Sequence, residues 1–225
     1  MSLLHWFIDL VLHLDKHLVE LLVRYDLWVY AILFVVIFAE TGFVVTPMLP
    51  GDSLLFAAGA LAAIDAGGKL QVLALWVLLA LAAILGNTLN YTIGRAIGNH
   101  ASGQRYRFVK ATHLQRTEAY FRRHGAPTVL LSRFAPILRT FAPFIAGIAR
   151  MPYGRFQAYN VLGGILWVGL FVGGGFLFGN LPAVKDHFGI VTISIILTSL
   201  LPMLLMIFNE RRQRAADLTR TRGTT

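Results

Sequence analysis

The amino-acid sequence predicts an all-α, polytopic membrane protein with two re-entrant helical hairpins and transmembrane helices in an inverted repeat. Its 225 residues are 56% hydrophobic and only 14% charged, a composition outside the range of soluble domains. Three apolar stretches are long enough to cross a bilayer. Two other apolar stretches are interrupted by prolines and carry charged residues, and the same order of elements follows each of them.

Three transmembrane helices are predicted, at about residues 70–98, 156–182 and 189–208. A helix needs about 20 residues to cross the hydrocarbon core of a bilayer, and each of these stretches contains such a run without a formal charge. We therefore expect three full spans.

The two interrupted stretches, about 27–64 and 126–149, are predicted to enter and leave the membrane on one side. In the second stretch, Pro136 and Arg139 divide the run into arms of about ten residues, each of which reaches only about halfway across. An interior proline also removes a helix hydrogen bond. A single span that carries two arginines is the costlier alternative. In the first stretch, the arm 53–64 is too short to span.

The two halves of the chain resemble each other. In each half an interrupted, charged stretch is followed by a full span, and Phe56–Gly59 ends the first hairpin much as Phe144–Gly147 ends the second. Both following spans contain glycines, which let membrane helices approach closely. These glycines are Gly86, Gly94 and Gly98 in one span and Gly163, Gly164 and Gly173–Gly175 in the other. Paired interrupted segments indicate a transporter with its site at the repeat interface.

Charges outside the apolar stretches orient the predicted helices. The loop 99–123 and the tail 209–225 are rich in arginine, which predicts that both are cytoplasmic and that the nearly neutral links 65–69 and 185–186 are external. The second hairpin must then start and end inside. Residues 1–26 have a helical amphipathic pattern, which predicts an interfacial helix on a side that the sequence leaves open.

Several classes of function are disfavoured. The chain has no cysteine and a formal net charge of +9; in so apolar a chain, that charge suits anionic lipids rather than nucleic acid. The segment Pro50–Leu54 contains the letters of the GDSL hydrolase signature, but no Asp stands three residues before any His, where such a serine finds its base. His13 and His17 have a metal-ligand spacing, although a solvated helix face is favoured. We expect no enzyme, metal or cofactor.

Four charged residues fall inside the interrupted stretches: Glu40 and Asp52 in the first, Arg133 and Arg139 in the second. A charge at bilayer depth costs roughly 2.5–3.5 kcal/mol, so it normally faces a partner, a cavity or a transported ligand. The acids as proton carriers would need a partly desolvated site. The alternative is a structural ion pairing between the acids and the arginines.

The arginines suit an anionic ligand. A guanidinium is a planar fork that binds phosphate in a bidentate manner, and Ser132 and Thr140 place hydroxyls beside Arg133 and Arg139 in the sequence. Phosphate and carboxylate would then compete for the same arginines, which is one way to couple protonation to substrate binding.

The motifs around these charges resemble those of the DedA family. They are F-A-E-T-G from Phe38, P-x-x-P-G-D-S from Pro47, G-N-x-x-N-Y-x-x-G-R from Gly86, R-F-x-P-x-x-R-T-x-x-P-x-x-A-G from Arg133 and N-x-x-G-x-x-x-W from Asn160. The resemblance covers roughly residues 25–205, and the combined motifs are highly specific.

That resemblance implies a bacterial inner-membrane lipid transporter, a flippase that returns undecaprenyl phosphate or a similar anionic lipid across the bilayer and depends on the proton motive force. The family is similar to the lipid-scramblase superfamily and is tied to envelope integrity. Its essential acidic pair and arginine pair correspond here to Glu40 and Asp52, for proton coupling, and to Arg133 and Arg139, for substrate phosphate. The expected supporting residues are Ser53, Asn87, Asn90, Tyr91, Ser132, Thr140 and Asn160.

The expected partners are an anionic polyprenyl phosphate or phospholipid, protons and membrane lipids, and a homo-oligomer is left open. The runner-up is a proton-coupled antiporter for small cations or drugs, in which the carboxylates would bind the substrate. The arginine pair weighs against it. A third class, a structural membrane organiser, would need none of the four charges at depth.

Overall fold

The computed structural model describes residues 27–43, 51–65, 68, 70–100, 127–134, 136–179, 181–185, 190–191 and 194–195. Within these ranges the regular elements are helices, and none is a strand. This confirms the predicted all-α class. The interfacial helix expected at 1–26, the tail at 209–225 and most of the span expected at 189–208 lie outside the described residues.

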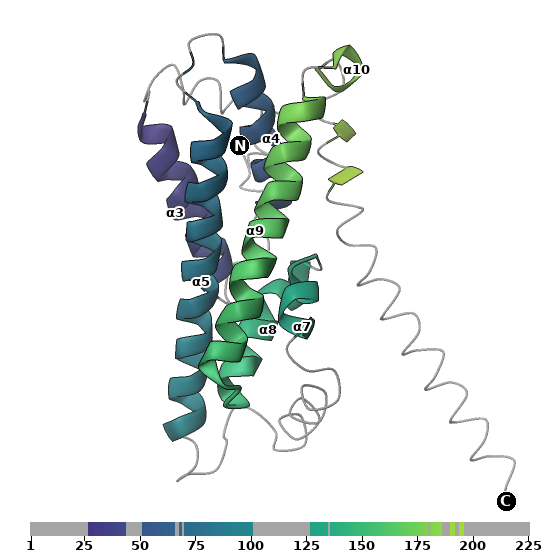
Figure 1. Cartoon of the computed structure of the whole chain (residues 1–225). Helices are drawn as coiled ribbons and strands as arrows, with labels where there is room; N and C mark the ends of the chain where they lie inside the picture. The colour runs from purple at the N-terminus through teal and green to yellow at the C-terminus, as the bar shows by residue number, and fades with distance from the viewer. Residues whose placement is uncertain are drawn as a thin grey trace, which may run out of the picture.

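Two long antiparallel helices form the centre of the structure (Figure 1). Helix α5 covers Val72–His100 with 29 residues, and α9 covers Tyr153–Phe178 with 26 residues. Both contain a stretch that is long and apolar enough to cross a membrane. Large apolar side chains are exposed along both helices, among them Leu73, Leu81, Leu166 and Leu170. Soluble proteins rarely expose so large an apolar surface to water, whereas in a membrane the lipid tails cover it.

The first interrupted stretch forms two shorter helices. Helix α3 covers Trp28–Gly42 and α4 covers Gly51–Ile64, with 15 and 14 residues. Each is about 21–23 Å long at 1.5 Å per residue, which is shorter than the bilayer core of about 30 Å. Helix α3 packs against α5, whereas α4 packs mainly against α9.

The second interrupted stretch differs in detail from the predicted arms of about ten residues. Helix α7 is only Pro127–Leu131, the 3₁₀ helix η1 is Ser132–Phe134, and α8 is Pro136–Ile148. The break therefore precedes Pro136, and Arg139 lies inside α8 rather than at the break. Proline suits the first turn of a helix, where its missing N–H has no helical partner to lose. A further short helix, α10, covers Pro182–Lys185.

The two shorter helices α4 and α8 make equivalent contacts with the two long helices. A Cβ on Gly59 of α4 would overlap the carbonyl oxygen of Val172 in α9. A Cβ on Gly147 of α8 would likewise overlap the carbonyl oxygen of Tyr91 in α5. Both crossings are therefore in backbone contact, as expected where small residues allow close approach. In each crossing the glycine ends a similar four-residue sequence, Phe56–Gly59 in α4 and Phe144–Gly147 in α8.

The other shorter helices, α3 and α7, also make equivalent contacts with the two long helices. Helix α3 packs against α5 of its own half, and α7 packs against α9 of its own half. At the first of these contacts, a Cβ on Gly86 would overlap the hydroxyl of Thr41. Each half thus contributes one helix to its own long helix and one to the long helix of the other half. In Figure 1, α4 lies along the upper part of α9, whereas α7 and α8 lie in the lower part of the molecule.

Candidate functional site

The four predicted charges come from the interrupted stretches, near the points where helices begin or end. Asp52 lies in the first turn of α4, and Arg139 lies in the first half of α8. Glu40 is close to the end of α3, and Arg133 belongs to η1. The N-terminal end of a helix carries a partial positive charge that stabilises an acid in the first turn. The start of α4 is therefore a favourable position for an acidic side chain such as that of Asp52.

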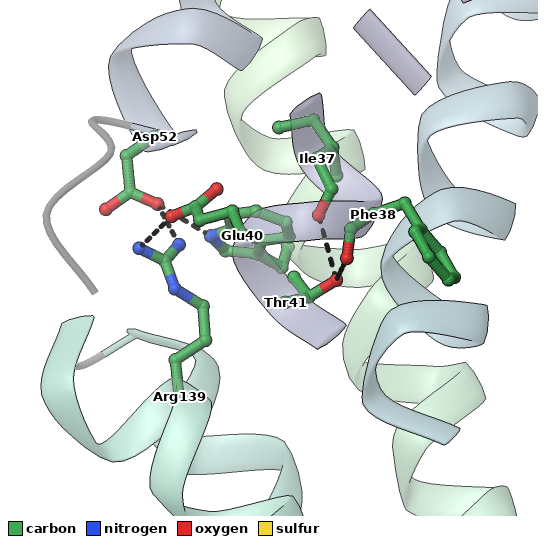
Figure 2. A network of polar contacts seen from close by, with 7 residues as sticks. Ile37, Phe38, Glu40, Thr41, Asp52 and Arg139 are labelled. Atoms are coloured by element: carbon green, nitrogen blue, oxygen red, sulfur yellow. Dashed lines mark hydrogen bonds and ion pairs between the residues drawn. The ribbon is translucent and has the colours of Figure 1, made fainter. Parts of the chain in front are cut away.

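Arg139 bridges both acids, as Figure 2 shows. Its Nη2 lies 3.0 Å from Oε1 of Glu40, and its Nη1 lies 2.7 Å from Oδ1 of Asp52. These three side chains are at most 8% exposed. The carboxylate of Glu40 also reaches the start of α4, because a Cβ on Gly51 would overlap it. We call Glu40, Asp52 and Arg139 the ion cluster; it joins α3, α4 and α8.

Trp167 of α9 completes the surroundings of the ion cluster. Its indole Nε1 donates a hydrogen bond of 2.9 Å to Oδ1 of Asp52, the oxygen that also accepts from Arg139. The guanidinium carbon of Arg139 lies 4.8 Å from the centre of the indole ring, and that of Arg133 lies 5.9 Å away. These distances allow cation–π attraction. Trp167 therefore contacts one acid and lies beside both arginines.

Arg133 is buried as deeply as Arg139 but has different partners. Its Nη2 donates to the Oδ1 of Asn160 at 2.6 Å and to the backbone carbonyls of Asn160 and Ala83 at 3.2 and 3.4 Å. Its Nε and Nη1 have no hydrogen-bond partner among the described residues. Arg139, by contrast, forms ion pairs with both Glu40 and Asp52. Arg133 is thus a buried cation whose described partners are neutral.

Two of the predicted supporting asparagines, Asn90 and Asn160, connect the helices that carry the four charges. Asn90 of α5 donates through Nδ2 to the carbonyls of Thr41 and Thr140, at 3.3 and 2.7 Å, and so joins α3 to α8. Asn160 of α9 donates to the carbonyl of Ile84 at 3.0 Å while it accepts from Arg133. Asn87, also on α5, is fully buried, and its amide has no partner among the described residues.

The other predicted supporting residues are less directly connected to the charges. Ser53 and Thr140 are buried beside Asp52 and Arg139 in the sequence. The hydroxyl of Ser132 donates to the carbonyl of Val129 at 2.9 Å, a bond within its own turn. Tyr91 lies in a separate apolar cluster, where its ring stacks on that of Phe156 and its hydroxyl donates to the carbonyl of Met151. The structure therefore does not bring Tyr91 to the ion cluster.

Trp167 and Thr41 were not among the predicted site residues. Trp167 ends one of the sequence motifs, and a buried tryptophan N–H usually finds a hydrogen-bond partner. That requirement could have indicated that Trp167 contacts a polar residue of the site. Thr41 follows Glu40 directly, and its hydroxyl donates to the carbonyl of Ile37 in its own helix at 2.9 Å. Its backbone carbonyl, which accepts from Asn90, joins it to the site. No sequence pattern indicates that contact.

The fold and the site define the class of the protein: an all-helical membrane protein with charged residues buried between interrupted helices. The comparison with protein families gives the particular family. The VTT domain matches residues 49–177 of this chain. With this match and the relatives described next, the chain belongs to the DedA family of membrane proteins, as its motifs predict.

Three relatives illustrate the extent of the match. The protein DedA of Escherichia coli K12 is 47% identical over 216 residues, which are 96% of this chain and 98% of that protein. The inner membrane protein YghB of the same strain is 37% identical over 81% of this chain and 79% of its own length. The inner membrane protein YqjA, also of Escherichia coli K12, is 35% identical over 80% of this chain and 79% of its own length. No solved structure matches the chain.

Proposed function

We propose that the protein is an inner-membrane flippase for an anionic lipid, which returns undecaprenyl phosphate or a similar phosphate lipid across the bilayer with protons. The observation that carries this proposal is Arg133: a fully buried guanidinium with neutral described partners and two N–H groups without a partner among the described residues. A buried charge normally has a counter-ion. An anionic headgroup would supply it.

The chemistry of the free atoms favours phosphate. Nε and Nη1 of Arg133 are charge-assisted donors on different edges of one planar group, and each can donate a hydrogen bond to a phosphate oxygen. Arg139 would assist through its charge, although its two terminal nitrogens already contact the acids. In this proposal only the headgroup enters the polar site, while the lipid tail stays in the bilayer.

Proton coupling follows from charge balance. Glu40, Asp52, Arg133 and Arg139 together carry no net formal charge. An anion bound at Arg133 would leave a buried excess of negative charge, and burial of unbalanced charge is costly. Protonation of Glu40 or Asp52 would restore the balance. Binding of an anion and uptake of a proton are thereby linked.

We propose the predicted inverted repeat with two re-entrant hairpins as the architecture of this transport. The equivalent crossings of α4 with α9 and of α8 with α5 support it, as does the shortness of the interrupted helices. In transporters with inverted repeats, interrupted helices meet at a midplane site, and one repeat rocks against the other. The relatives YghB and YqjA are named inner membrane proteins, which supports an inner-membrane location for this protein. A cytoplasmic C-terminus remains a prediction.

The alternative function, antiport of small cations or drugs with protons, finds less support. Its substrate would have to bind Glu40 or Asp52, and Arg139 already contacts both carboxylates. A cation would therefore have to displace Arg139, which contacts both acids, and approach Arg133, whose described partners are neutral. Both steps oppose binding.

Transport in proteoliposomes tests the flippase proposal. Undecaprenyl phosphate is placed in the outer leaflet, and its movement is followed with and without a pH gradient. We expect Arg133→Gln to abolish movement, because it removes the proposed headgroup partner, and Glu40→Gln to remove the dependence on the gradient. Arg155→Gln is the matched control, since Arg155 is an exposed arginine of α9.

Two results would contradict the proposal. Wild-type protein that moves no anionic lipid would exclude the function. Unchanged movement in a correctly folded Arg133→Gln variant would exclude the role of Arg133 as the headgroup partner.

A further inference from the structure

Asn87 has unmet hydrogen-bonding capacity in the interior of the molecule. Its side chain is 0% exposed, and neither Oδ1 nor Nδ2 has a hydrogen-bond partner among the described residues. Buried side-chain polar atoms are nearly always paired, so each exception requires an explanation. A leucine of similar size would fill the same space without this cost.

The position of Asn87 on α5 relates it to the proposed headgroup site. Residues three and four apart share one face of a helix. Asn87 follows Ala83 by one turn, and the carbonyl of Ala83 accepts from Nη2 of Arg133. It precedes Asn90 by three residues, and Asn90 joins α3 to α8. Asn87 therefore lies on the buried face of α5, between the contact with Arg133 and the level of Thr140.

The unpaired atoms on Arg133 and along this face of α5 include acceptors as well as donors. The donors are Nε and Nη1 of Arg133 together with Nδ2 of Asn87. Oδ1 of Asn87 is an acceptor, and so is Oδ1 of Asn90. The orientation of the Asn90 amide is fixed, because its Nδ2 faces two carbonyl oxygens. A fully ionised phosphate would satisfy the donors, but it has no proton to offer the acceptors.

We infer that Asn87 is a specificity-determining residue that recognises the P–O–H group of a phosphate monoester. This inference rests on the proposed function and concerns the same site. A singly charged monoester has oxygens that accept from Arg133 and one hydroxyl that donates to an amide oxygen. A phosphate diester of the same charge has no hydroxyl on phosphorus and would leave that oxygen unpaired.

Two lipids that differ by one methyl group isolate this contact. Dioleoyl phosphatidic acid is a monoester, whereas dioleoyl phosphatidylmethanol is its methyl diester. Each is added to proteoliposomes, and its movement between leaflets is measured. We expect wild-type protein to move the monoester at least about tenfold faster than the diester, the factor that a hydrogen bond to a charged group typically contributes.

Asn87→Leu is the decisive variant. We expect its ratio of monoester to diester movement to fall to about one, through slower movement of the monoester. Its melting temperature should not fall, because leucine removes two unpaired polar atoms from the interior. Thr92→Leu is the control: Thr92 is exposed on the same helix, so neither the ratio nor the melting temperature should change.

The outcomes separate this inference from the proposed function. If wild-type protein moves undecaprenyl phosphate but neither of these two lipids, the inference fails alone; if it moves none of the three lipids, the proposed function fails as well. Equal movement of both lipids by wild-type protein, or an unchanged ratio in Asn87→Leu, would overturn the inference alone. A large loss of melting temperature in both Asn87→Leu and Asn87→Ala would assign Asn87 a structural role and would also overturn it.

Inorganic phosphate shares the chemistry of the headgroup, and the same vesicles distinguish the two sources. We expect no uptake of radiolabelled inorganic phosphate by wild-type protein. Uptake that Asn87→Leu abolishes, without movement of either lipid, would show that the residue serves a free phosphate and would overturn the assignment to a lipid.

Discussion

Arg139 and Arg133 belong to successive elements, α8 and η1, and both are buried beside Trp167, yet their surroundings differ. Arg139 contacts two carboxylates in the ion cluster. Arg133 contacts an amide and backbone carbonyls, and two of its N–H groups have no partner among the described residues. One arginine is charge-compensated within the fold, whereas the described partners of the other are neutral.

This difference bears on the two interpretations that the sequence left open. Structural ion pairing describes Arg139, and phosphate binding is proposed for Arg133. The two roles can coexist, because removal of one partner of a buried pair leaves an uncompensated charge, while a cation with neutral partners can accept an anion. Three variants test whether the surroundings of Arg139 and Arg133 differ in this way, beginning with the variant that should affect stability most.

Replacement of Arg139 by glutamine should destabilise the protein most. Arg139→Gln leaves Glu40 and Asp52 buried together without a cation, and such a loss costs about 3–5 kcal/mol. Thermal unfolding in detergent measures the effect. The addition of Glu40→Gln and Asp52→Asn should restore much of the stability. An unchanged melting temperature in Arg139→Gln would show that the ion cluster does not contribute to folding.

Trp167→Phe should have an intermediate effect on stability. It keeps an aromatic ring near the guanidiniums but removes the N–H donor to Asp52, a bond to a charged group worth about 1.5–3 kcal/mol. Trp76→Phe is the matched control, because the Trp76 indole donates to the neutral carbonyl of Ile165, and such a bond contributes only about 0.5–1.5 kcal/mol. Equal losses in thermal unfolding of the two variants would contradict the special role of Trp167.

Asn160→Asp should make the two arginines alike, with the smallest effect on stability. The new carboxylate would replace the amide oxygen that lies 2.6 Å from Nη2 of Arg133. The ion pair gained should offset the loss of the Nδ2 donor, which faces the carbonyl of Ile84 and the side-chain oxygens of Thr88 and Gln157, so stability should change by no more than about 1 kcal/mol. Movement of anionic lipid should nevertheless be lost, because Arg133 then has an internal counter-ion.

Gln157→Glu provides the matched control for Asn160→Asp. It adds the same charge one turn earlier on α9, where Gln157 contacts Thr88 and Asn160 rather than Arg133. Movement of anionic lipid should therefore be reduced less in Gln157→Glu than in Asn160→Asp. Full transport by a folded Asn160→Asp protein would contradict the view that Arg133 must remain without a carboxylate.

Part of the fold was predictable because its causes are local. The uncharged, apolar runs within α5 and α9 identify these helices from length and composition, and the prolines locate the interruptions approximately. The sequence placed the second break at Pro136 and Arg139, whereas the structure places it directly before Pro136, because a proline is compatible with a helix start; Arg139 therefore lies inside α8. The repeated four-residue sequences also indicated close packing, although not against which helix.

The four charges of the candidate site were predictable because charge is so costly in an apolar segment. Their pairing was not. Arg133 and Arg139 have the same residue type, similar surroundings in sequence and nearly equal burial. Their difference depends on Asn160 and Trp167, which belong to α9, and on Asp52, which belongs to α4. Their functional roles stay predictions.

The sequence by itself determined the all-α class, the family and the residues that carry charge into the apolar interior, because composition, helix length and motifs are properties of single segments. The tertiary structure alone decided that Arg139 contacts both acids, that Arg133 does not, and that the amide of Asn87 is buried without a partner among the described residues. Hydrogen bonds and ion pairs act over about 3 Å, and helices separated by tens of residues come that close only when the whole bundle is packed.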